Sequence, residues 1–80
     1  MITAYIQAAL RHAHYELLED QTYYGEIDGL QGVYANADSL EQCRDQLQEA
    51  LEGWILLGVR FGHHLPIVDG IVLNVQLELA

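Results

Sequence analysis

The sequence contains no lysine and only three arginines against 12 acidic residues, so its formal net charge is −9. Proteins that bind nucleic acids through the phosphates need clustered Lys and Arg side chains. We therefore expect no direct contact with nucleic acid. The excess of acids favours a basic protein partner through electrostatic steering, and it would equally serve to keep a small apolar protein in solution. Charge alone does not choose between these two interpretations.

Cysteine and long apolar runs are also scarce. The one cysteine, Cys43, excludes an internal disulfide framework and fits a reducing cytoplasm. The longest apolar run, residues 54–59, is far shorter than the ~20 residues that span a bilayer. Only ten residues of mixed polarity precede Arg11, which does not fit a signal peptide. We expect a single domain over residues 1–80, cytoplasmic and without membrane contact.

What the chain does contain is apolar side chains, at 51% of its residues. A domain of this size buries only about 60% of the surface that its unfolded chain exposes. Some of the apolar side chains are therefore expected in a subunit or partner interface.

Hydrophobic periodicity predicts an α+β fold in the order α-β-β-β-α-β-β, with one short and one long helix around an antiparallel sheet. Gly25, inside the second strand, indicates close packing against another element or a bulge. The predicted elements are a helix over residues 1–13, strands over 14–18, 22–27 and 33–37, a helix from residue 39, and strands over 67–68 and 71–79.

The long helix is the clearest element. Ser39 begins a capping box, in which its hydroxyl accepts a hydrogen bond from the Gln42 amide while the Gln42 side chain reaches back to the cap. An apolar stripe follows at helical spacing through Leu40, Cys43, Leu47, Ala50, Leu51, Trp54 and Leu57. The expected core is Ile6, Leu10, Ile27, Val33, Leu40, Cys43, Leu47, Leu51 and Trp54.

The end of the chain alternates, with Leu73, Val75, Leu77 and Leu79 on one face of the expected last strand. A long terminal strand on so small a sheet leaves an open apolar edge, and such edges are usually paired or covered. We therefore expect a homodimer, or a higher oligomer, that pairs through the C-terminal strand.

Residues with catalytic or metal-binding chemistry are present but poorly placed for it. His63 and His64 are adjacent, with only Asp69 near at ligand spacing, so a solvated pair in a loop is favoured over a metal site. Cys43 lies on the apolar stripe, which favours a small buried hydrophobe over a nucleophile. His12 and His14, beside a helix-to-strand junction, are expected at the surface.

Four carboxylates on or beside strands could converge as in a two-metal nuclease, but the Arg and Lys side chains that would hold nucleic acid are missing. We therefore expect no catalytic, cofactor or metal site and no enzymatic activity. The carboxylates weighed are Glu16, Glu26, Asp28 and Asp38. The strand tyrosines Tyr23, Tyr24 and Tyr34 suit a partly buried sheet face or a protein interface.

The order of several short motifs resembles the HicB-like antitoxin family, the antitoxin half of the HicAB toxin–antitoxin pair. The motifs read YYGEI at Tyr23–Ile27, LQGVYA at 30–35, SLEQC at 39–43, EGWI at 52–55 and LPIVDGI at 65–71. The resemblance covers residues 4–71. Asp28 and Gln31 stand where the family usually has prolines in the turn.

This resemblance implies a partly degenerate ribonuclease H-like fold without nuclease activity, and a partner that is a small basic mRNA-cleaving toxin of the HicA type. Larger members carry a C-terminal DNA-binding segment, whereas these 80 residues end in an expected strand. The alternative is a stand-alone homo-oligomeric structural or regulatory protein. The candidate partner-contact residues are the acids Asp20, Glu26, Asp28, Asp38, Glu41 and Asp45.

Overall fold

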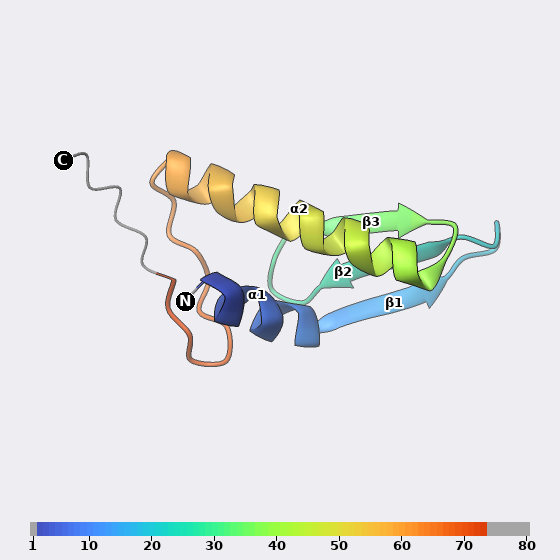
Figure 1. Cartoon of the computed structure of the whole chain (residues 1–80), viewed down its shortest axis with the longest axis horizontal. Coiled ribbons are helices and arrows are strands. Elements are labelled where there is room, and N and C mark those ends of the chain that lie inside the picture. The colour runs from blue at the N-terminus through green and yellow to red at the C-terminus, as the bar shows by residue number, and fades with distance from the viewer. Residues whose placement is uncertain (1, 74–80) are drawn as a thin grey trace.

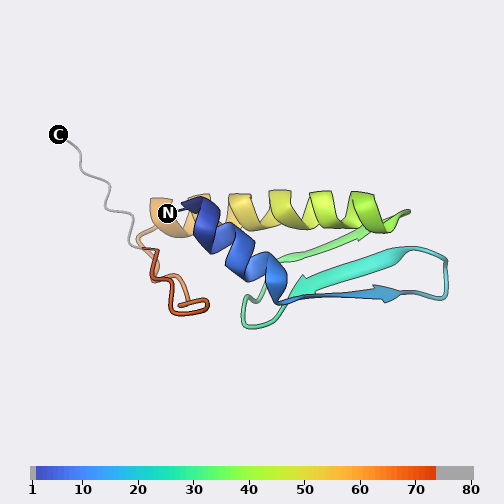
Figure 2. The same ribbon diagram turned by 60° about the horizontal axis from the view of Figure 1, so that its bottom comes forward.

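The computed structural model describes residues 2–73 as a three-stranded sheet with two helices. The strands form one antiparallel sheet in the order β1-β2-β3, α2 lies along one face, and α1 crosses beside the second half of α2 (Figures 1 and 2). The α+β class with one short and one long helix is therefore confirmed. The elements are α1 (Ile2–Arg11), β1 (Ala13–Leu17), β2 (Tyr23–Ile27), β3 (Tyr34–Ala37) and α2 (Leu40–Arg60).

The sheet has a continuous register without bulges. Ala13 faces Ile27 at one end of the β1–β2 pair, and Tyr23 faces Ala37 at the far end of the β2–β3 pair. Because side chains alternate between the two sides of a strand, odd-numbered residues point toward α2 and even-numbered residues point away from it. The side covered by α2 carries Ala13, Tyr15, Leu17, Tyr23, Gly25, Ile27, Ala35 and Ala37.

The core lies between this covered side, α2 and α1. Most of the expected core residues are buried, namely Ile6, Ile27, Val33, Cys43, Leu47 and Leu51, while Leu10 and Trp54 are half-buried. The prediction for Leu40 is wrong, because its side chain is 40% exposed. The buried stripe of α2 advances in steps of four residues, which rotates it slowly around a helix of 3.6 residues per turn. Ile55 is therefore buried at its end, and Leu40 falls outside it.

Both ends of α2 have ordinary capping chemistry. The Ser39 hydroxyl accepts a hydrogen bond from the Gln42 amide at 3.1 Å, which confirms the first half of the capping box; the reciprocal bond from the Gln42 side chain is not among the hydrogen bonds of residues 2–73. At the other end, Gly62 adopts a φ of +68°, and the His63 amide donates to the Gly58 carbonyl at 2.8 Å. Positive φ after the last turn is where glycine ends a helix without strain.

After α2, the described chain holds a tight turn rather than the expected strands. Val68 and Ile71 form a single bridge around Asp69 and Gly70, whose φ angles of +50° and +75° fit a type I′ turn. The predicted turn is correct, but the strand expected at 67–68 is reduced to one bridge, since so short a hairpin cannot sustain a ladder alone. Most of the last expected strand, from residue 74, and the homodimer through it lie outside the described residues.

The structure also bears on membrane contact. Neither helix within residues 2–73 combines the length and the apolar content that a membrane crossing requires.

Candidate functional site

The side of the sheet that faces away from α2 is left uncovered by the elements of residues 2–73 (Figure 2). The alternation of the strands places polar and aromatic side chains on this side, and Tyr34 is 61% exposed. We call the six side chains on it the open sheet face. They are His14, Glu16, Tyr24, Glu26, Tyr34 and Asn36.

Two tyrosines form the centre of the open sheet face. The rings of Tyr24 and Tyr34 stack across β2 and β3, with centroids 6.4 Å apart and an interplanar angle of 23°. The Tyr24 hydroxyl donates to the Glu26 carboxylate at 3.3 Å. Burial, and then the charge of Glu26, raise the pKa of Tyr24, so its hydroxyl remains a neutral donor. The face therefore combines flat aromatic surface with carboxylate oxygens that are open to a partner.

One corner of the open sheet face extends to the loop after β2. His14 Nε2 lies 2.8 Å from Asp28 Oδ2, with both side chains largely exposed. A hollow of about 300 Å³ lies over the β2–β3 connection, between the Tyr24 and Tyr34 side chains and the turn at residues 28–32. A partner on the open sheet face could therefore also reach this turn.

The structure divides the six candidate contact acids into two groups. Glu26 lies on the open sheet face, and Asp28 is joined to it through His14. Asp20, in the β1–β2 connection, accepts hydrogen bonds from Thr22 that lower the pKa of its carboxyl. The register places residue 38 beside this connection, at the opposite end of the sheet from Asp28. We call the second group the hairpin-end acids, namely Asp20, Asp38, Glu41 and Asp45.

A second hollow lies between β1 and the first half of α2. It has a volume of about 450 Å³ and holds Arg44, one of the three arginines, together with Glu41 and Asp45. Burial raises the pKa of Tyr15, which also lines the hollow, and the Arg44 charge opposes that effect. Sequence reasoning missed this groove, because no local pattern tells which edge of the sheet α2 leaves uncovered.

The carboxylates weighed for a two-metal site do not converge. Glu16, Glu26 and Asp28 lie on or beside the open sheet face, whereas Asp38 lies at the hairpin end. Within residues 2–73, no three His, Cys, Asp or Glu side chains are placed to hold one metal ion.

The single thiol is placed for packing. Cys43 is fully buried, and its Sγ donates to the Ala35 carbonyl at 3.7 Å. Burial raises the pKa of this thiol, so it stays protonated. The interpretation of Cys43 as a small buried hydrophobe is therefore confirmed.

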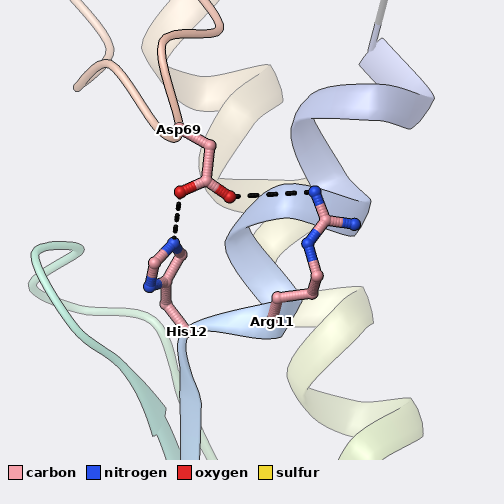
Figure 3. A network of polar contacts seen from close by, with 3 residues as sticks. All are labelled: Arg11, His12 and Asp69. Carbon is pink, nitrogen blue, oxygen red and sulfur yellow. Dashed lines mark hydrogen bonds and ion pairs between the residues drawn. The ribbon is translucent and has the colours of Figure 1, made fainter.

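The remaining polar contacts tie the C-terminal turn to α1. His12 Nε2 lies 2.7 Å from Asp69 Oδ1, and the Arg11 guanidinium lies 3.7 Å from Asp69 Oδ2 (Figure 3). As expected, His63 and His64 are exposed. The contacts of Asp69 hold the turn beside the His14–Asp28 corner of the open sheet face, since the Asp28 amide donates to the His12 carbonyl at 3.4 Å.

Comparison with known proteins identifies the family. A family model described as UPF0150-like matches residues 4–66. The chain belongs to the UPF0150-like family. Its matched segment begins in α1 and ends beyond α2, so the open sheet face of this UPF0150-like chain lies within the family domain.

Among solved structures, the UPF0150-like chain is similar to the crystal structure of TTHA0281 from Thermus thermophilus. The two share 38% sequence identity over 94% of each chain, with a TM-score of 0.87. None of the curated protein sequences matches the chain. The shared architecture thus extends over nearly the whole of both chains.

Proposed function

We propose that this chain is a HicB-like antitoxin module, which binds and neutralises a small basic mRNA-cleaving toxin without catalysing a reaction itself. The observation that carries the proposal is the stacked pair Tyr24–Tyr34, which lies beside the Glu26 carboxylate on an uncovered side of the sheet. The motif resemblance over residues 4–71 supplies the family of the partner.

The open sheet face suits arginine-rich protein surfaces. Carboxylates accept bidentate hydrogen bonds from guanidinium groups, and a tyrosine ring attracts a cation placed over its face. The Glu26 carboxylate lies 3.3 Å from the Tyr24 hydroxyl, so one arginine could make both interactions at this place. A protein that cleaves RNA must itself present Arg and Lys to phosphates, so carboxylates on this face would take the place of the RNA. The net charge of −9 would speed the encounter.

The degenerate ribonuclease H-like fold belongs to the same proposal. Three antiparallel strands followed directly by a helix on one face of the sheet support it. On this scaffold the carboxylates are spread over two ends of the sheet, which favours a binding role over metal-dependent cleavage.

The test begins with a search of the flanking genes for a small basic protein. Co-expression of the two should restore growth that the basic protein alone arrests, and the purified pair should associate more tightly at about 50 mM than at about 300 mM salt, since salt screens charge attraction. If growth is not restored and no complex forms at low salt, the antitoxin role is wrong.

Substitutions then locate the contact. Tyr34→Ala and Glu26→Gln should each weaken the complex about tenfold or more, as truncations at the centre of an interface do. Glu49→Gln makes the same charge change on the exposed side of α2 and serves as the matched control. Calorimetry that finds equal losses for Glu26→Gln and Glu49→Gln would remove the open sheet face from the proposal.

A further inference from the structure

The outer edge of β1 has unpaired backbone groups within the described chain. The Leu18 amide donates to the Thr22 carbonyl at 2.8 Å, and the Asp28 amide donates to the His12 carbonyl at 3.4 Å. In an antiparallel ladder, hydrogen-bonded pairs alternate with pairs that are not hydrogen-bonded. The even-numbered residues of β1 therefore bond to β2. The N–H and C=O groups of the odd-numbered residues, Ala13, Tyr15 and Leu17, point out of the sheet.

This edge has few of the features that normally prevent strand pairing. Edge strands are usually protected by proline, by lysine, by a bulge or by a covering element. The segment Ala13–Leu17 has neither proline nor lysine, and its register with β2 is continuous. β1 forms the margin of the sheet in both views of the described chain (Figures 1 and 2). Leu17, at the end of the strand, leaves an apolar side chain 55% exposed.

We infer that β1 pairs antiparallel with β1 of a second copy of this chain, about a twofold axis at Tyr15, to give one continuous sheet. Around that axis, Ala13 faces Leu17 of the second copy, and His14 faces Glu16 of the second copy. The outward backbone groups then meet one another, because every hydrogen-bonded pair joins two odd-numbered residues. Each such pair exchanges two bonds, so the interface gains about six backbone hydrogen bonds.

The side chains select this register over its neighbours. Moving the axis to Glu16 would set two glutamates directly opposite each other, and moving it to His14 would set two histidines opposite each other. A histidine and a carboxylate can hydrogen-bond across an antiparallel pair, whereas two carboxylates directly opposite each other destabilise it. An axis between two residues would set each odd-numbered residue opposite an even-numbered one. The backbone groups of the even-numbered residues already bond to β2, so no hydrogen bonds would form between the copies. His14 is already held through Nε2 by Asp28, so only an imidazolium, with both ring nitrogens as donors, also bonds Glu16 of the second copy.

The groove beside β1 offers one cation that reduces the charge repulsion between two copies. A chain of charge −9 repels its own copies unless the shared surface matches its acids with cations. The groove carries Arg44 between Glu41 and Asp45, so it presents both signs of charge. A twofold interface uses the same surface on both copies and must be self-complementary. Arg44 of one copy can therefore face the acids of the other.

The inference goes beyond the proposed function, and its test needs no toxin. Sedimentation of the chain alone, from about 1 to about 200 μM, should show a species of about 18 kDa, twice the 9.0 kDa of one chain. Leu17→Pro removes an outward N–H without removing a bond to β2, and it should weaken dimerisation at least tenfold. Circular dichroism checks that this variant folds.

A charge swap tests the register independently. His14→Glu should weaken the dimer, because the new carboxylate would face Glu16 of the second copy. Adding Glu16→Arg to that variant should restore the dimer, since the two new side chains attract across the axis. Glu16→Arg alone is the control, because the new arginine also lies beside Glu26 in its own chain; without its acidic counterpart it should weaken the dimer rather than restore it.

Three results would overturn the inference. The first is a monomer at every concentration. The second is a dimer that Leu17→Pro and His14→Glu leave unchanged. The third is a dimer that Leu77→Lys dissociates while the Leu17→Pro and His14→Glu variants remain dimeric. That result would assign the pairing to the C-terminal segment.

Discussion

Gly25 in β2 has no room for a side chain, so replacing this strand glycine with alanine should destabilise the fold. A Cβ at Gly25 would lie 2.9 Å from Cδ1 and Cε1 of Tyr15 and 3.2 Å from Sγ of Cys43. Overpacking of this kind typically costs about 1–3 kcal/mol. Alanine recovers part of this, since glycine within a strand is less favourable by roughly 0.5–1 kcal/mol. We expect Gly25→Ala to lower the free energy of unfolding by about 1–2 kcal/mol.

Gly53 provides the matched control. A Cβ there meets nothing within 4 Å, in the interior of α2. Gly53→Ala should therefore raise the free energy of unfolding by about 0.5–1 kcal/mol, which is the difference in helix propensity. Urea unfolding at one fixed protein concentration measures both variants, because self-association would otherwise shift the midpoint. A Tyr15→Ala background should reduce the cost of Gly25→Ala. Shifts of the same sign for both glycines would refute the reasoning.

Two further predictions concern a cap and a buried hydroxyl. Ser39→Ala should lower the free energy of unfolding by about 1 kcal/mol, because it loses the hydrogen bond from the Gln42 amide. Ser39→Asp should keep this hydrogen bond and the stability. Equal urea midpoints for the two variants would contradict the prediction. Tyr5→Phe should cost about 0.5–1.5 kcal/mol, because the Tyr5 hydroxyl donates to the Pro66 carbonyl at 2.6 Å. Burial raises the pKa of Tyr5, so the folded chain holds the phenolic proton more tightly than the unfolded chain. Stability should therefore fall as the pH rises above about 10, the ordinary value for tyrosine, and less steeply in Tyr5→Phe; equal slopes in urea titrations from about pH 8 to about pH 11 would contradict this.

The elements from α1 to α2 could be predicted from sequence because each has a local cause. Period-two alternation marks the strands, and the Ser39 cap starts α2 at the expected residue. The direction of the buried stripe could not be predicted in this way. It advances from Cys43 to Ile55 in four-residue steps, and only packing against the rest of the fold selects Ile55 over Trp54. Tyr5 was missed because the acceptor of its hydroxyl, Pro66, lies 61 residues away along the chain.

The candidate site was predictable in part. Alternation correctly puts Tyr24 and Glu26 on the same side of β2, but it does not say which side α2 covers. The stack of Tyr24 on Tyr34 depends on the register between β2 and β3, which turn chemistry and packing set together. Acidic residues chosen by charge and exposure alone therefore fell at two ends of the sheet.

The separation of these acids suggests that they serve two stages of binding. Two stretches without acids, residues 1–15 and 53–68, include all of α1 and the last turns of α2, which lie at one end of the molecule (Figure 1). The hairpin-end acids lie at the other end. The uneven charge would thus orient a basic partner before contact. At physiological salt this steering acts over the Debye length of about 8 Å.

Contact at the open sheet face depends instead on short-range chemistry. If both stages operate, neutralising the hairpin-end acid Asp20 should slow association with little effect on dissociation. Tyr34→Ala should do the reverse, because losing a packed ring weakens the formed complex more than the encounter. Stopped-flow kinetics of the two variants separate these effects. If Asp20→Asn accelerates dissociation as much as Tyr34→Ala does, the hairpin end is itself part of the contact.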